Sequence, residues 1–160
     1  MTEAWYLKID GIDGESTAVG HQGEIDVLSW SGGVSVDAGR QGSGGGAGRP
    51  EFGELRVTAR ISQASPKLLA ACATGRHLAS AQLSGVRPHT GRRSGDYLQY
   101  RLEEVTVSSV DHRDAEAEVP TEQFALLYGL IEVSYTPQDE TGGPGEPVVF
   151  SYDLRRRRVE

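Results

Sequence analysis

The sequence predicts a single, mainly β domain that carries one α-helix and one long glycine-rich loop. Short apolar segments recur along the 160 residues and are separated by turns that contain glycine or aspartate. Only one segment combines helical spacing with signals for both helix ends. A chain of this length fits one domain whose core needs no disulfide. Because Cys72 is the single cysteine, an internal disulfide is excluded.

Each predicted strand rests on one of two patterns. Either apolar and polar side chains alternate, or both faces of the strand are apolar. The predicted strands are residues 5–9, 24–30, 54–61, 78–86, 96–110, 123–135 and 147–154. Within 96–110 the apolar side chains change phase at Glu103 and Glu104, which predicts a β-bulge there.

The predicted strand 123–135 is apolar on both faces, so two different surfaces must cover it. One is the core, and the other is a helix or a neighbouring subunit. Leu130, Val133 and Tyr135 are therefore predicted subunit-interface residues, because exposed apolar patches of this size usually mark interfaces.

Four consecutive arginines, residues 155–158, lie near the C-terminus. Such a run can be a nucleic-acid or membrane patch, a solvated strand end or a set of intersubunit ion-pair partners. The last two are favoured, and Arg155 and Arg157 are added to the interface candidates.

The helix is predicted over residues 65–75, with Ser65 as N-cap, Pro66 at the first helical position and Gly75 just past the end. It is too short to be stable alone, so it must lie against the sheet. Its predicted apolar stripe consists of Leu68, Leu69, Cys72 and Ala73. On this stripe Cys72 is expected to be a buried, unreactive side chain.

Residues 31–52 form a glycine-rich stretch that is unusually long for a loop in a compact domain. Alternation at Val34 and Val36 predicts an extended arm that projects from the domain and can pair with another backbone. A disordered surface loop without a role is the alternative. The predicted contact residues of the arm are Val34, Val36, Arg40, Gly44, Gly45, Gly46 and Arg49.

The sequence predicts no enzyme, cofactor or metal site. Residues 42–47 fit a dinucleotide-binding fingerprint, but the required helix does not follow them. The histidines at positions 21, 77, 89 and 112 lack paired metal-ligand spacing. Asp10 and Asp13 are better explained by turns than by a calcium loop, and no nucleophile elbow is present.

The net charge of −7 makes nucleic acid an unlikely partner, since an acidic chain gains no counterion release on DNA. No segment approaches the roughly 18 apolar residues of a membrane helix. The first residues lack the basic and apolar regions of a secretory signal peptide. If the protein leaves the cell, another machine must export it.

A series of short segments along nearly the whole chain matches a known pattern in a fixed order. The segments are 6–16 (YLKIDGIDGES), His21 with 24–31 (EIDVLSWS), 46–49 (GAGR), 64–69 (ASPKLL), 73–78 (ATGRHL), 96–98 (DYL), 107–110 (VSSV), 121–122 (TE) and 135–138 (YTPQ). Each is weakly specific alone, but together and in this order they resemble the Hcp (haemolysin-coregulated protein) family.

The resemblance implies a squashed β-barrel of two antiparallel sheets with one flanking helix. It also implies a structural role as the tube subunit of a type VI secretion system, made in the cytoplasm and secreted without a signal peptide. Subunits of this family form homo-hexameric rings that stack, and the implied partners are a contractile sheath, a spike protein and effectors carried in the lumen.

The chain departs from the family pattern at two places. Gly32 and Gly33 follow Ser31 where a tryptophan is common, and Leu130 stands where lysine is frequent. Stacking strength and cargo preference are therefore not carried over from the resemblance. Two other functions remain open: a tube protein of a different contractile injection system, and a β-barrel effector or binding module.

Overall fold

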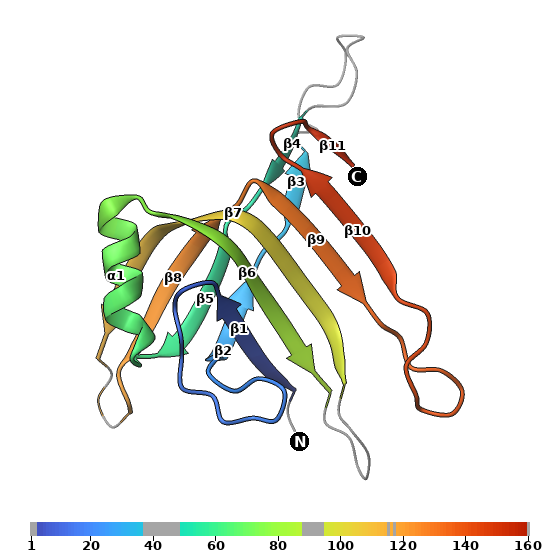
Figure 1. Cartoon of the computed structure of the whole chain (residues 1–160), viewed down its shortest axis with the longest axis horizontal. Coiled ribbons are helices and arrows are strands. Elements are labelled where there is room, and N and C mark those ends of the chain that lie inside the picture. Colours follow the sequence, from blue (N-terminus) through green and yellow to red (C-terminus); the bar gives the residue numbers. More distant parts are fainter. Residues whose placement is uncertain (1–2, 37–48, 88–94, 115, 117, 160) are drawn as a thin grey trace.

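A computed structural model describes residues 3–36, 49–87, 95–114, 116 and 118–159. Strands make up most of this part of the chain, and one helix flanks them (Figure 1). The elements are β1 (Ala4–Ile9), β2 (Ile25–Ser31), β3 (Val34–Val36), β4 (Pro50–Phe52), β5 (Leu55–Arg60), α1 (Ala64–Thr74), β6 (His77–Val86), β7 (Asp96–Arg113), β8 (Thr121–Leu127), β9 (Leu130–Tyr135), β10 (Val148–Asp153) and β11 (Arg158–Val159).

Six antiparallel strands close into a barrel. Their order is β7-β6-β1-β2-β5-β8, and β8 pairs back onto β7 to complete the wall. Strands β9, β10 and β11 continue the same sheet beyond β7, and Figure 1 shows β9 and β10 extending to the side of the barrel opposite α1. Hydrogen bonds thus join the barrel and this extension into one sheet, and the mainly β barrel with a helix is confirmed.

The core fills the barrel interior, because each wall strand turns alternate side chains inward. Leu7 on β1, Leu83 on β6, Leu102 on β7 and Phe124 on β8 are all at most 2% exposed. The barrel therefore has a packed interior around these large apolar side chains.

The predicted strand 123–135 is wrong as one element, because the chain breaks at Tyr128 and Gly129 into β8 and β9. Both strands nevertheless pair with β7 in one register, with Thr106 opposite Leu127 and Glu103 opposite Leu130. The break is where β8 turns into the barrel wall, pairing with β5, while β9 joins the extension.

Glu104 has a left-handed backbone with φ of 53°, at the position where the sequence predicts a bulge. This conformation changes the phase of the pleat, so that both Leu102 and Val105 face the core. The shift in register against β8 lies further along, between Val107 and Ser109.

Helix α1 starts before its predicted N-cap. Its N-cap is Gln63, and Ser65 is a buried helical residue whose hydroxyl accepts a hydrogen bond from Ser62 N–H at 2.9 Å. Gly75 ends the helix with φ of 64°, as predicted. The predicted apolar stripe is partly wrong. The buried face of the helix consists of Ala64, Ser65, Leu68 and Ala71. Leu69 and Ala73 are exposed, and Cys72 is half-buried.

Candidate functional site

An apolar face on the extension of the sheet remains uncovered. Val148 lies opposite Tyr135 and Phe150 lies opposite Val133, so the four side chains share one face of β9 and β10. Val148 is 67% exposed, Tyr135 41% and Phe150 40%, whereas Val133 is half-buried. We call these four residues the extension face. An apolar surface of this kind is typical of a protein–protein interface.

The outer edge of β10 adds backbone groups to this surface. Strand β11 pairs only with Tyr152 and Asp153, at one end of β10. In the part of the chain that the structure describes, no strand pairs with the outer edge of β10 at Val148, Val149 or Phe150. Such an edge can accept a strand from another chain.

Only some of the predicted interface residues lie on the extension face. Tyr135 and Val133 belong to the extension face, while Leu130 is half-buried at the junction with the barrel. Arg155 donates to Glu104 at 2.7 Å, so its charge already has a partner within the chain. Arg157 is exposed on the turn between β10 and β11, with φ of 53°.

The predicted arm is anchored by a short hairpin, β3 and β4, in which Val34 pairs with Phe52 and Val36 with Pro50. Both valines are about half exposed, and the Phe52 ring lies 4.7 Å from that of Tyr152 on β10. The arm residues Arg40, Gly44, Gly45 and Gly46 lie outside the described residues, and Arg49 is exposed just before β4. Figure 1 shows that the hairpin lies near the β10–β11 turn, at the end of the molecule away from the N-terminus.

A second cluster, centred on His21, was not predicted as a site. The His21 ring is buried and stacks on Tyr6, with ring centroids 4.5 Å apart. Its Nδ1 lies 3.0 Å from Glu24 Oε1 and its Nε2 lies 2.8 Å from Asp96 Oδ1. Both ring nitrogens can donate only in the imidazolium form, so the geometry suits the charged ring.

The electrostatics of the cluster agree with this geometry. Burial alone would lower the pKa of His21, but the hydrogen bonds to Glu24 and Asp96 raise it above the ordinary value of 6.5. The cluster joins the loop after β1 to the first residue of β7. Glu24 follows His21 by only three residues, so this pair could have been found in the sequence. Asp96 is 75 positions from His21, and nothing in the sequence indicated that contact.

A third cluster contains a buried carboxyl group beneath α1. Glu122 is 1% exposed, its Oε2 lies 3.1 Å from His112 Nε2, and its Oε1 is buried without a hydrogen-bond partner among the described residues. Burial raises the pKa of Glu122, although Ser65 and His112 both act in the opposite direction. The His112 imidazole contacts this carboxyl group, whereas nucleophilic catalysis needs the imidazole next to a hydroxyl.

Among the described residues, no group of three or more His, Cys, Asp or Glu side chains is arranged to hold a metal ion. None of the helical structure described is long and apolar enough to cross a membrane.

Comparisons with known proteins agree with the fold and with each other. The model of the family described as "Type VI secretion system effector, Hcp" matches residues 6–135. Protein hcp1 of Pseudomonas aeruginosa is 36% identical over 159 residues, which cover 98% of each chain.

Solved structures show the same similarity. A protein described as a type six secretion system protein superposes with a TM-score of 0.88 and 26% identity, over 99% of this chain and 100% of that one. Hcp1 from Salmonella typhimurium superposes with a TM-score of 0.80 and 28% identity, over 100% of both chains. The chain therefore belongs to the Hcp family, the tube subunits of type VI secretion systems.

Proposed function

We propose that six copies of this chain form a closed ring, that the rings stack into a tube, and that effectors travel in its lumen. The role is structural, without a catalytic step. The observation that carries the ring is the extension face, since Val148, Phe150 and Tyr135 leave in water the apolar surface that a neighbouring subunit would cover.

The open edge of β10 supports a head-to-tail contact. The edge is present once per subunit, and it needs a complementary surface elsewhere on the next copy. Contacts between two different surfaces form a closed ring when the rotation between copies is a fraction of a full turn. Six copies give the ring that the family implies.

The arm supports stacking. The β3–β4 hairpin carries the exposed side chains Val34 and Val36 at one end of the molecule, and residues 37–48 connect its two strands. Contacts from this end to the next ring are expected to build the tube. The sheath, spike protein and effectors are its proposed partners, and assembly is proposed to occur in the cytoplasm before secretion.

The ring is tested by placing a charge in the extension face. Val148→Asp buries a carboxylate in the proposed interface, so it is expected to convert the hexamer to monomers at micromolar concentration. Light scattering should give six times the 17.2 kDa chain mass for the parent protein and one chain mass for the variant.

Val19→Asp is the matched control, because Val19 is 92% exposed and lies in a loop outside the extension face. It should remain hexameric. A monomeric parent protein, or a Val148→Asp variant that stays hexameric, would contradict the proposed interface.

Stacking is tested separately by deleting residues 37–48. The deletion leaves the extension face intact, so the ring should persist while tubes, seen by electron microscopy, become short or absent. Tubes as long as those of the parent would show that the arm is dispensable.

A further inference from the structure

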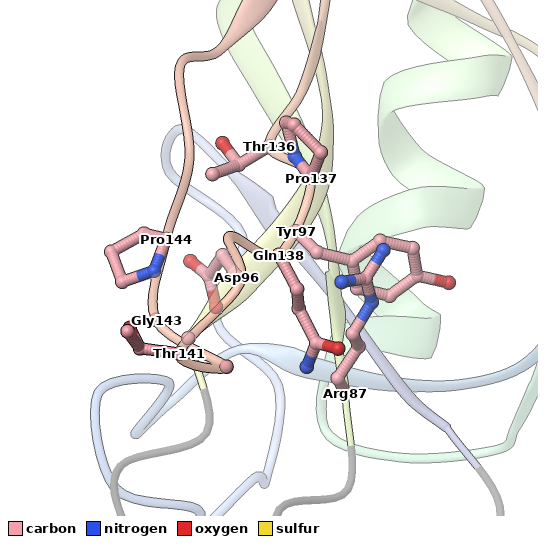
Figure 2. Close-up of a pocket in the computed structure, with 11 residues that line it drawn as sticks. Arg87, Asp96, Tyr97, Thr136, Pro137, Gln138, Thr141, Gly143 and Pro144 are labelled. Atoms are coloured by element: carbon pink, nitrogen blue, oxygen red, sulfur yellow. The ribbon is translucent and has the colours of Figure 1, made fainter.

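A pocket of about 910 Å³ opens between the neighbouring ends of β6 and β7 and the loop that joins β9 to β10. Its size falls within the roughly 300–1,000 Å³ typical of sites for small ligands. Arg87, Asp96 and Tyr97 form one side, while Pro137, Gln138 and Pro144 form the other (Figure 2). The lining thus combines the apolar surfaces of Tyr97, Pro137 and Pro144 with polar side chains and glycines.

The guanidinium group of Arg87 is held in a fixed position in this pocket. Its central carbon lies 4.5 Å from the ring centroid of Tyr97 and 5.6 Å from that of Tyr135. One terminal nitrogen donates to the Tyr135 hydroxyl at 2.8 Å. Stacking and hydrogen bonding together fix the orientation of the remaining N–H donors.

Within the described part of the chain, Arg87 is one of the arginines that have no acidic partner. Arg56, Arg101 and Arg155 each lie within 4 Å of a carboxylate oxygen. No carboxylate of the described residues lies within that distance of the Arg87 guanidinium. Among the described residues the only hydrogen-bond partner of this cation is the neutral phenol of Tyr135, so its remaining donors can serve an anion.

The nearby acids are engaged elsewhere. Asp96 accepts from Gln99 at 3.1 Å through Oδ2, and its Oδ1 lies against the imidazole of His21. Glu3 interacts with the hydroxyl of Tyr97. Their negative charges weaken the field of Arg87, but their contacts leave its free donors available to a ligand.

The opposite wall is a loop with its own hydrogen bonds. Asp139 Oδ1 accepts from Thr141 N–H and Gly143 N–H, both at 2.8 Å, and Gly145 N–H donates to Pro137 C=O at 2.7 Å. These backbone donors are used within the loop. Polar recognition in the pocket therefore depends on side chains, among them Arg87 and Gln138, which both line it (Figure 2).

We propose that this pocket binds a carboxylate attached to an apolar group. Arg87 and Gln138 receive the carboxylate, while Tyr97, Pro137 and Pro144 contact the apolar part. The carboxylate has two possible sources, a free organic acid and an acidic side chain of a peptide, and the binding chemistry is the same for both.

The test uses the purified, assembled protein and isothermal titration calorimetry. Phenylacetate supplies a carboxylate beside an apolar ring, and neutral phenylacetamide is its matched control. A blocked Gly-Glu-Phe tripeptide and its Gly-Gln-Phe analogue form the peptide arm. Each acid is expected to bind about tenfold more tightly than its neutral analogue, because the neutral compound cannot form the charge-assisted hydrogen bond with Arg87.

Arg87→Gln should remove this preference, and Arg87→Lys should keep part of it. Arg101→Gln, a change at an exposed arginine outside the pocket, should leave it unchanged. Unfolding midpoints and particle mass show whether each variant remains folded and assembled. Binding of phenylacetate alone would assign the site to free acids, and binding of the Glu peptide would assign it to peptides.

Three results would overturn the proposal: neither acid binds, each acid binds as well as its neutral analogue, or a folded Arg87→Gln protein keeps the preference. If Arg87→Gln fails to fold, Gln138→Ala provides the second variant, because Gln138 is exposed on the loop. It should weaken acid binding without changing particle mass, and unchanged affinity would then count against the site.

Discussion

The indole ring of Trp5 lies on the backbone of Gly85, its direct partner on the neighbouring strand β6. A Cβ built on Gly85 would collide with carbon atoms of the six-membered part of that ring. The same indole is 5.1 Å from the ring of Trp30 and 6.0 Å from that of Tyr97. A glycine at position 85 therefore allows these aromatic side chains to pack together across the sheet.

Gly85→Ala is expected to destabilise the fold by about 1–3 kcal/mol, because Trp5 must move out of a packed cluster. The lower entropy of the unfolded alanine chain offsets only about 0.4–1 kcal/mol. Denaturant unfolding followed by circular dichroism measures the loss, and a shift in tryptophan emission reports the displaced ring.

Gly33→Ala is the control for this prediction, because no atom lies within 4 Å of a Cβ at that position. Its effect should stay within about 0.5 kcal/mol. Equal stability of the two alanine variants would contradict the role assigned to Gly85.

His21 is expected to make stability depend on pH. Because the folded pKa of His21 is raised, its contribution is complete below the unfolded value of 6.5 and is lost as pH rises through the folded pKa. His21→Gln should therefore destabilise on the order of 1 kcal/mol near pH 6, and by less at higher pH. Unfolding free energies of parent and variant between about pH 5.5 and 8.5 provide the measurement.

His77→Gln is the matched control, since His77 is exposed at the start of β6. The difference in unfolding free energy between His77→Gln and the parent protein should not fall with rising pH as it should for His21→Gln. A pH-independent effect of His21→Gln would mean that the ring acts by packing alone.

Glu122 is expected to contribute a second loss of stability with rising pH. Burial raises its folded pKa, so the neutral carboxyl favours folding at low pH, and this advantage is lost as pH rises through the folded pKa. Glu122→Gln cannot ionise and should become progressively more stable than the parent as pH increases from about 4 to 7. Thermal unfolding across this range tests the trend, and a constant difference would refute it.

Cys72 and Leu68 should behave differently although they are one turn apart on α1. Cys72 is half-buried, so a maleimide should label it in the native protein, and Cys72→Ser should cost less than about 1 kcal/mol. Leu68 is 0% exposed, and Leu68→Ala should cost about 2–5 kcal/mol. Native labelling no faster than global unfolding would show that the thiol is covered, for example in the assembly.

Elements that depend on neighbouring residues could be predicted from the sequence. The sequence pattern located the barrel strands β1, β2, β5, β6 and β7 to within a few residues, and Gly75 marked the end of α1. The N-cap was misplaced because Ser65 has the right chemistry for a cap but its hydroxyl accepts from Ser62 N–H from inside the first turn. The face of α1 that is buried was partly wrong, because tertiary packing selects among adjacent apolar positions.

Features that depend on distant residues could not be predicted. The doubly apolar run 123–135 predicted one strand with two covered faces, whereas its division into β8 and β9 follows from pairing with β5 and β10. Asp96 and Tyr135, the partners of His21 and Arg87, are distant in sequence and are brought near by strand pairing within the sheet. The extension face was anticipated through Val133 and Tyr135, whereas Val148 and Phe150 were seen only as part of a strand.

Strand β7 belongs to both halves of the sheet, since it pairs with β8 in the barrel and with β9 in the extension. A tensile load applied to the extension would therefore pass along a covalent backbone into the barrel wall. The hydrogen bonds along β7 would be loaded in shear and would have to yield together, whereas a hinge would concentrate the load on a few bonds. A subunit pushed or pulled through its extension should accordingly move as one mechanical unit.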